Sequence, residues 1–338
     1  MMDIERICRE AGALKWAVLR PEEVSPEDVR RHYEHWLKRG NEGALSYIDK
    51  RLAMLIDPFG VRPWAKSLLL IVFRPEKVSD SPLLRLPSPT ESGGVGRIAG
   101  YALREDYHLA GRRILERIKE ELSEFGVTQS ELCVDSSPVP EKYLAKVAGL
   151  GTGAPNSLVR VSDFGCRVYL GALFIDLELP SLHGNAMFAV GCASCLKCRL
   201  ACPNRAMMDD GTLIVRACRS WMAGEWRGPL TWAQQNALGG NLFGCSICSS
   251  CCPEDALGDE DLHVDCLQIL KMPTGELKRL IAGTPLQHVG TTLLKRNAAA
   301  AVGVQCGTPV LQKELLEICN SPVVAETVRA WKDRRAWL

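Results

Sequence analysis

The stretch GCASCLKCRLACPNRA, residues 191–206, spaces four cysteines closely and follows the last one with a proline. A second stretch, FGCSICSSCCPEDA at 243–256, contains four more cysteines directly before Pro253. Closely spaced cysteines that end in a Cys-Pro pair are typical of [4Fe–4S] cubes, and in two-cluster proteins the Cys-Pro cysteine ligates the opposite cube. The two motifs therefore predict two cubes. Structural zinc is the alternative, although four-cysteine zinc sites usually consist of two separated CxxC pairs.

The motifs also predict which cysteines bind each cube. The first cube would take Cys192, Cys195, Cys198 and Cys252, and the second would take Cys202, Cys245 and Cys248. The eighth ligand is either Cys251 or Cys218, which lies in VRACRSWM between the motifs. Adjacent cysteines cannot easily reach two different cubes, so the spacing favours Cys218 and leaves Cys251 as the alternative.

Length, composition and charge are those of an ordinary globular protein. The 338 residues are enough for two or three domains, and hydrophobic and charged residues make up 46% and 24% of them. The formal net charge of +1 gives no overall field that selects nucleic acid, a membrane or an acidic partner. We expect no signal peptide and no membrane span. The 15 cysteines fit metal ligation in a reducing compartment, so we expect a cytoplasmic protein.

Hydrophobic patterns predict alternating helices and strands before the cysteine motifs and helices after them. Strands are expected at 14–19, 67–73, 132–136 and 166–179, and helices at 3–12, 26–40, 43–53, 138–149 and from about 108 to 125. Residues 79–97 and the glycine-rich 149–157 read as loops. The fold class is therefore an N-terminal α/β (α+β) domain at 1–185, a ferredoxin-like double [4Fe–4S] domain at 186–262, and a short helical, HEAT-like tail at 263–338.

Several further stretches resemble the cobalamin-dependent epoxyqueuosine reductases. They are GNEGALSYI (40–48), YALREDYH (101–108), VDSSPVPEK (134–142), GLG (149–151) with Asn156, ACRSWMAGEWRGPL (217–230) and TPLQHVGTTLLKRNAAAAVG (284–303). The resemblance extends over nearly the whole chain, and it is the combination of these stretches with the cysteine motifs that makes it specific.

The resemblance implies a reductase that converts epoxyqueuosine in tRNA to queuosine. It implies cobalamin in the N-terminal domain beside the first cube, and electrons that pass through the cubes from an external donor such as flavodoxin or ferredoxin. Asp135 would be the proton donor, because breaking an epoxide C–O bond leaves an alkoxide that needs an acid. Cys218 would ligate the second cube. The residues expected to contact the cofactor are Tyr107, His108, Gly149, Gly151, Gly153 and Asn156.

One loop departs from the family pattern. The family typically has an aromatic residue, any residue, Gly and Lys between GLG and the asparagine, whereas this chain has Thr152, Gly153, Ala154 and Pro155. The aromatic residue and the lysine are both absent. Because this loop is expected to contact cofactor or substrate, the change bears on which substrate the protein accepts.

Other interpretations of these residues and of the whole chain stay open at this stage. Asp135 could be a turn or capping residue, and the glycines of 149–157 could simply make a tight turn. The chain as a whole could be a cobalamin-dependent reductase of a small organic substrate, similar to reductive dehalogenases. It could also be an electron-transfer module that has the cubes and no cobalamin.

Overall fold

The computed structural model describes residues 2–184, 192–255 and 258–337, without the side chains of Ala193 and of residues 334–337. Its largest sheet has the strand order β1-β2-β7-β4, and all three pairings are antiparallel. The strands are β1 (Lys15–Leu19), β2 (Ser67–Phe73), β7 (Tyr169–Ile175) and β4 (Ser130–Cys133). The four strands predicted from hydrophobic patterns are thus present. The bounds of 67–73 match, the strands predicted at 14–19 and 166–179 are shorter, and the one predicted at 132–136 begins two residues earlier and ends three residues earlier.

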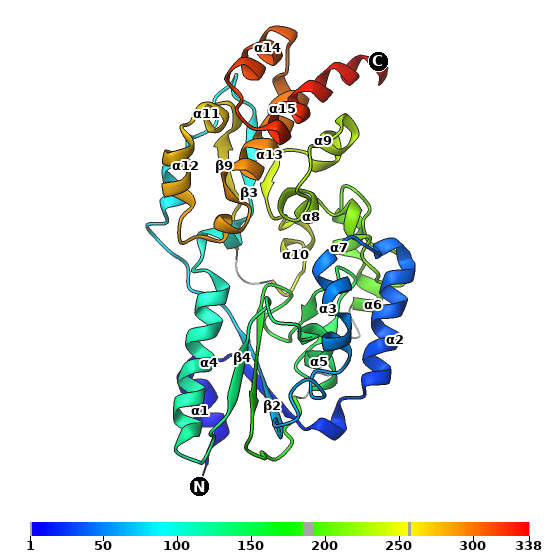
Figure 1. Cartoon of the computed structure of the whole chain (residues 1–338), viewed down its shortest axis with the longest axis vertical. Coiled ribbons are helices and arrows are strands. Elements are labelled where there is room, and N and C mark those ends of the chain that lie inside the picture. Colours follow the sequence, from blue (N-terminus) through cyan, green and yellow to red (C-terminus); the bar gives the residue numbers. More distant parts are fainter. Residues whose placement is uncertain (1, 185–191, 256–257, 338) are drawn as a thin grey trace.

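Helices cover both faces of this sheet (Figure 1). Alternate side chains of β2 point to opposite faces, so Leu69 and Ile71 pack with α1 (Ile4–Ala11) and α4 (Tyr107–Ser123). Leu68 and Leu70 pack on the other face, against side chains of α2 (Pro26–Trp36) and α5 (Glu141–Val147). Every residue of β2 is buried, which confirms the prediction of a strand covered on both sides.

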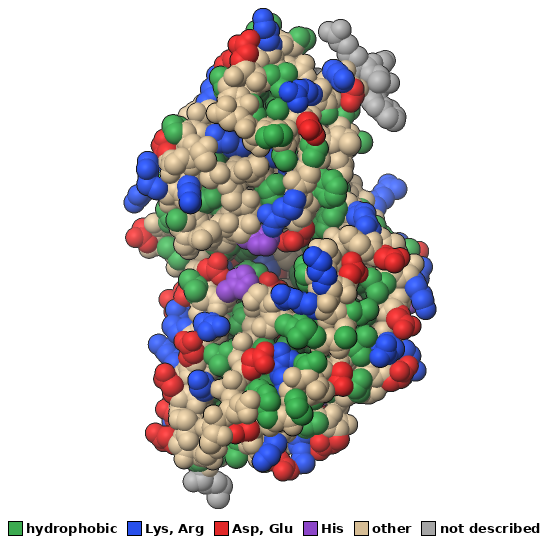
Figure 2. Space-filling model, viewed as in Figure 1, with side chains coloured by type: hydrophobic (Ala, Val, Ile, Leu, Met, Phe, Trp, Pro, Cys, Tyr) green, Lys and Arg blue, Asp and Glu red, His purple; other side chains and the backbone are tan. Residues whose placement is uncertain are grey.

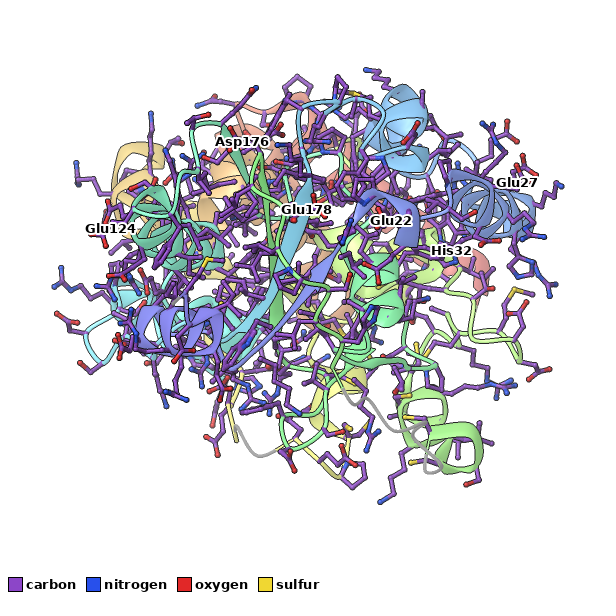
Figure 3. The ribbon with its side chains drawn as sticks, turned by 90° about the horizontal axis from the view of Figure 1, so that it is seen from below. Glu22, Glu27, His32, Glu124, Asp176 and Glu178 are labelled. Atoms are coloured by element: carbon purple, nitrogen blue, oxygen red, sulfur yellow. The ribbon has the colours of Figure 1, made fainter. Side chains whose placement is uncertain are left out.

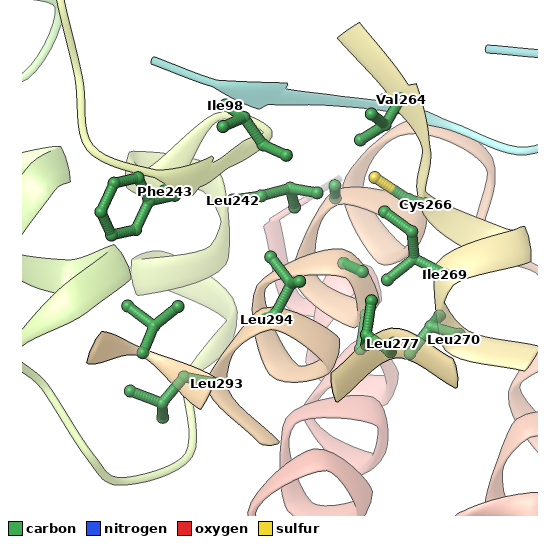
Figure 4. Close-up of a cluster of buried hydrophobic side chains, with 14 of the residues drawn as sticks. Ile98, Leu242, Phe243, Val264, Cys266, Ile269, Leu270, Leu277, Leu293 and Leu294 are labelled. Carbon is green, nitrogen blue, oxygen red and sulfur yellow. The ribbon is translucent and has the colours of Figure 1, made fainter. Parts of the chain in front are cut away.

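A second core lies in the upper part of the molecule (Figures 1 and 4). Its small sheet has the order β8-β3-β9, formed by Asn241–Phe243, Val95–Ile98 and Leu262–Asp265. Five helices pack around it: α11 (Cys266–Lys271), α12 (Thr274–Ile281), α13 (Gly290–Cys306), α14 (Pro309–Ile318) and α15 (Pro322–Arg329). The alanines of α13 at 298–301 are buried, which allows close packing of its neighbours.

This core corrects two local predictions. Residues 79–97 include a 3-10 turn (Pro82–Arg85) and the start of β3, and Leu83 and Leu86 are core residues, so the segment is not simply a loop. Residues 262–265, predicted as helical, form β9, because their backbone pairs with β3. Both errors concern very short strands whose partners are distant in sequence. The domain bounds 1–185, 186–262 and 263–338 stay a prediction.

The cysteine-bearing segments connect the two cores. They are α6 (Cys192–Cys195), α7 (Lys197–Ala201), α8 (Arg219–Gly224) and α10 (Ile247–Ser250), with α9 (Trp232–Leu238) beside them. Asn41, which follows α2, donates to Leu213 O and accepts from Val215 N, both at 2.9 Å. The Trp221 Nε1 atom donates to Ala44 O, just before α3 (Ser46–Ile56), at 2.9 Å. These bonds fix the N-terminal part against the segment 213–221.

Figure 3 views the end of the large sheet near Glu22, Asp176 and Glu178. There, Arg20 pairs with Glu22 at 2.9 Å and with Glu178 at 2.7 Å, and both glutamates are exposed while Arg20 is half-buried. The predicted site residues Tyr107, His108 and Asp135 lie at the opposite end, where the sheet meets the cysteine segments. In the described parts of the chain, no helix has the length and apolarity to cross a bilayer.

Candidate functional site

The cysteines of the two motifs form two neighbouring groups. The thiolates of Cys195, Cys198 and Cys252 act electrostatically on one another or on Cys192. The second group consists of Cys202, Cys218, Cys245 and Cys248. Burial raises the pKa of Cys248, and the charges of Cys245, Cys218, Cys198 and Cys202 raise it further. Burial is the main cause that raises the pKa of Cys218 and Cys245, so these thiols need a metal to ionise them at neutral pH. We refer to these groups as the first and second cysteine sets.

Cys251 lies beside the first set: burial raises its pKa, and the charges of Cys198, Cys252 and Cys195 raise it further. It is therefore a fifth cysteine at a place that already has four, whereas Cys218 lies with the set that otherwise has three. This arrangement supports the choice of Cys218 over Cys251. The assignment of each ligand is still a prediction.

The loop 152–155, which differs from the family pattern, borders the first cysteine set. A cavity there is lined by Ala154, Pro155 and Asn156 together with Cys192, Cys195, Cys198, Cys248 and Cys252. The buried Asn156 donates from Nδ2 to Cys248 O at 3.1 Å. Cys166 is buried and lines the same cavity. The change from the family pattern thus falls next to a cube rather than next to Asp135.

The three predicted cofactor glycines pack against protein. Gly149 has φ +68°, and a Cβ there would meet Gly184 O at 2.2 Å. A Cβ at Gly151 would meet the Val159 side chain at 2.5 Å, while one at Gly153 would meet only the Lys146 side chain at 3.5 Å. The glycines allow the chain to pass closely over 159–160 and 184. Their contact with a cofactor stays a prediction.

Asp135 lies in the turn between β4 and α5, at the end of the sheet nearest the cysteines. Its φ of 54° is unusual for a residue with a side chain, so the surrounding structure holds it in place. Its Oδ2 accepts a hydrogen bond from the Tyr107 hydroxyl at 2.8 Å and lies 3.4 Å from His108 Nε2. The side chain is 61% exposed, so the carboxylate is open to a ligand while its partners orient it. Three predicted site residues are thus brought together: Asp135, Tyr107 and His108.

His108 is held between two carboxylates. Its Nδ1 lies 2.9 Å from Asp106 Oδ1, and hydrogen bonds to Asp106 and then Asp135 raise the pKa of His108 to about 9. The same contact with His108 lowers the pKa of Asp135. At neutral pH the proton therefore resides on the imidazole and the Asp135 carboxylate is ionised. The Tyr107 ring stacks between His108 and Tyr169, with centroids 4.1 and 4.6 Å away.

A half-buried acid, Glu141, supports the Asp135 turn. Glu141 Oε1 accepts from Asp135 N at 2.9 Å, and burial followed by the Asp135 charge raises the pKa of Glu141 to about 8. Lys142 acts on the pKa values of both Asp135 and Cys218. Burial raises the pKa of Tyr101, and the charges of Tyr169, Cys245 and Cys218 raise it further. The Asp135 group thus lies within electrostatic range of the second cysteine set. The placement of cobalamin beside the first cube stays a prediction.

A second histidine–carboxylate pair belongs to the same site and was missed by sequence reasoning. His288 Nε2 lies 3.0 Å from Glu225 Oε1 and 3.2 Å from an Arg227 guanidinium nitrogen. The His288 contact lowers the pKa of Glu225, and the Asp135 charge acts on it in the opposite direction. Figure 2 shows histidine side chains on both sides of a hollow between the upper and lower parts. The signal was present in the quoted stretches 217–230 and 284–303, which contain the pair.

Helix α8 leads from the second cysteine set to this pair. Cys218 caps its N-terminus and Glu225 its C-terminus, so roughly 10 Å of helix separates them. The carbonyls at its C-terminal end accept from the fully buried Arg296, whose guanidinium binds Met222 O at 2.6 Å and Gly228 O at 2.9 Å. A cation there satisfies carbonyls that the helix leaves unpaired and complements its dipole.

Comparison with known protein families matches residues 191–255 to a 4Fe-4S double cluster binding domain. This match favours two [4Fe–4S] clusters over zinc. Over 233 residues, the chain is 30% identical to an epoxyqueuosine reductase from Cyclobacterium marinum, an alignment that includes 67% of this chain and 70% of that one. A relative of the same name from Pseudomonas aeruginosa is 29% identical over 295 residues, 83% of this chain and 80% of the other.

Solved structures agree with this fold. Epoxyqueuosine reductase from Streptococcus thermophilus superposes with a TM-score of 0.78 at 23% identity, over 96% of this chain and 87% of that one. An epoxyqueuosine reductase solved with an epoxyqueuosine-modified tRNA-Tyr stem loop gives a TM-score of 0.76 at 20% identity, over 97% and 96%. The double cluster domain and the identity to curated relatives define the class, an oxidoreductase with two [4Fe–4S] clusters. The chain belongs to the epoxyqueuosine reductase family.

Proposed function

We propose that this protein reduces the epoxide of epoxyqueuosine in tRNA to give queuosine. The observation that carries the proposal is the exposed Asp135 carboxylate, which Tyr107 orients and His108 supplies with a proton, at the same hollow that α8 connects to the second cysteine set. Removal of an epoxide oxygen as water uses two electrons and two protons. The hollow contains proton-carrying groups, and the cysteine sets provide an electron path.

The residues around Asp135 fit cobalamin, which the family uses. Tyr47, Leu109 and Trp226 are exposed by 51%, 59% and 37%, which is apolar surface for a flat macrocycle to cover. Leu109 follows His108 directly, and the charges of Asp135 and Glu225 act on the Tyr47 hydroxyl. When bound, cobalamin would supply the low-potential centre for C–O bond cleavage. Both nitrogens of His108 are engaged by carboxylates, so this histidine has no free nitrogen to offer a metal.

The described side chains divide the work of proton transfer. Asp135 lies where it can deliver a proton to the oxygen that leaves the substrate carbon. His108 carries that proton at neutral pH and returns it to the Asp135 oxygen 3.4 Å away. Tyr107 holds the carboxylate by its hydroxyl, and its stacking on Tyr169 fixes the ring. Asp106 holds the other imidazole nitrogen, which fixes its orientation.

Relatives support the same assignment. One solved relative is an epoxyqueuosine reductase bound to a modified tRNA stem loop, and another, from Bacillus subtilis, has its catalytic aspartate loop swung out of the active site. Asp135 here also lies on a loop, between β4 and α5. We further infer a cytoplasmic location and reduction by an external low-potential carrier, since a chain with two cubes has no electron source of its own.

The proposal is tested with protein reconstituted anaerobically with iron, sulfide and cobalamin. We expect about eight irons and one cobalt per chain, and conversion of an epoxyqueuosine-modified tRNA stem loop that mass spectrometry detects as the loss of one oxygen. Asp135→Asn should abolish most conversion, while Asp80→Asn, at an exposed turn, should leave it unchanged. Eight irons without cobalt, or turnover of small halogenated or epoxide compounds instead of the tRNA, contradicts the proposal.

A further inference from the structure

The two cysteine sets have different surroundings. In the segment 192–202, none of the residues whose burial is described is fully buried, and Leu196, Lys197 and Leu200 are exposed. Around the second set, the strand β8 and the side chains of Ser246 and Ser249 are buried. An electron that arrives from outside the protein therefore reaches the first set before the second.

The exposed segment beside the first set is partly apolar. Leu200 is 80% exposed and Leu196 is 38% exposed. Leu200 N donates to Leu196 O at 2.9 Å, so Leu196, the residue directly before α7, lies one turn away from Leu200. Leu196 and Lys197 also line the cavity that contains Cys192, Cys195 and Cys198. Apolar side chains that solvent reaches this freely are unusual beside a cofactor site unless something covers them.

The charges on this segment are of one sign. Residues 192–205 include Lys197, Arg199 and Arg205 and no acidic residue. Arg199 is paired with Asp209, whereas Lys197 and Arg205 make no ion pair with any described residue. The acids near the second motif have partners, for example Glu254 with Arg160 and Asp259 with Arg104. We call Leu196, Lys197, Leu200 and Arg205 the α7 patch.

We propose that the α7 patch is the docking surface for a small acidic electron-carrier protein that reduces the first cube. The inference rests on the proposed function, to which it adds the entry point of the electrons. One electron leaves the carrier and one cube gains it, and no bond or proton is exchanged. Such complexes are small and weak, and they depend on charge steering around a small apolar contact, which the leucines and the two cations provide. The phosphates of tRNA would need a larger set of cations and would not cover the leucines.

The test follows cube reduction in the reconstituted holoenzyme by stopped-flow absorbance, with flavodoxin hydroquinone as the electron donor. Leu200→Glu and Arg205→Glu should each lower the second-order rate constant about tenfold, because they remove apolar contact and reverse the steering charge. They should also weaken its dependence on salt. The matched controls are Val310→Glu and Lys278→Glu. Val310 is an apolar residue on α14 that is 79% exposed, and Lys278 is an exposed cation on α12. Iron content and the rate with dithionite should be unchanged in all four.

Three results would overturn the inference: unchanged rates with flavodoxin, equal losses in the controls, or an equal loss with dithionite. A loss of tRNA stem-loop binding without a change in flavodoxin rate would assign the patch to RNA instead. The assay uses neither tRNA nor substrate turnover, so it can succeed when the proposed substrate is wrong. It can equally fail while dithionite-driven conversion of the tRNA continues.

Discussion

The two sides of the hollow carry the same pair of residue types in different electrostatic settings. On the α/β side, His108 lies between two carboxylates, and its pKa rises to about 9. On the other side, His288 has one carboxylate, Glu225, and its Nε2 also lies 3.2 Å from a guanidinium nitrogen of Arg227. The first setting stores a proton beside an exposed acid, whereas the second keeps a carboxylate charged. We infer that the Asp135 side supplies protons and the Glu225 side positions a ligand.

The largest expected effect is the loss of the second cube, whose ligand Cys218 begins the helix α8 that ends at Glu225. Cys218→Ser should remove a ligand at the start of α8, so the second cube is lost and the iron content falls from about eight to about four per chain. Cys251→Ser is the matched control and should keep both cubes. Iron analysis and the electron paramagnetic resonance spectrum of the reduced protein measure the difference. The opposite pattern would show that Cys251 is the eighth ligand.

Next in size is the contrast between the two carboxylates. Asp135→Asn should lower kcat for epoxyqueuosine tRNA about 10²- to 10⁴-fold, because the general acid is removed from the reacting oxygen. Glu225→Gln should lower kcat less than about tenfold and act mainly on KM, because a positioning group contributes to binding. Both variants should keep their iron and cobalt. Equal losses of kcat in the two variants would contradict the assignment of proton donation to Asp135 and of ligand positioning to Glu225.

Local patterns were enough to predict much of this architecture. The spacing of the cysteines predicted both cubes, and the unbroken apolar run at 67–73 predicted a strand that is buried on both faces. Asp135, Tyr107 and His108 were proposed from the family resemblance, and the fold places them in direct contact. The cubes and the strand depend on residues that are near each other in the chain or on motifs of fixed spacing. Asp135 and Tyr107 are 28 positions apart, and the family resemblance was what named them.

The features that were missed depend on long-range pairing. Glu225 and His288 are 63 positions apart, and neither has a local pattern that marks it as a site residue. The strands β3 and β8 have only four and three residues, so their periodicity is too short to read, and it is their pairing that defines them. The location of Asn156 beside Cys248 likewise comes from the way 149–158 folds back, which spacing alone does not determine.

A third prediction tests the support of α8. Arg296→Met keeps most of the side-chain volume but leaves several buried carbonyls without a donor, so it should lower the free energy of unfolding by about 3 kcal/mol. Arg216 also donates to two carbonyls, Gly40 O and Glu42 O, but is exposed, so Arg216→Met should cost less than about 1 kcal/mol. Anaerobic thermal unfolding monitored by circular dichroism compares the two. Similar unfolding temperatures would mean that α8 does not need its buried cation.

The smallest expected change at neutral pH is also the most specific to the Asp135 side. In the wild type, the proton is present on the His108–Asp135 pair below pH 9 and is lost above it, so kcat/KM should fall as pH rises through about 9. In His108→Gln this alkaline fall should disappear and the rate at pH 7 should drop about tenfold. The Asp135 pKa then returns toward its ordinary value, so the remaining activity should increase as the pH is lowered. His263→Gln, at an exposed position of β9, should keep the wild-type profile. An unchanged alkaline fall in His108→Gln would place the stored proton on another group, and Glu141, whose pKa is raised to about 8, would be the next residue to substitute.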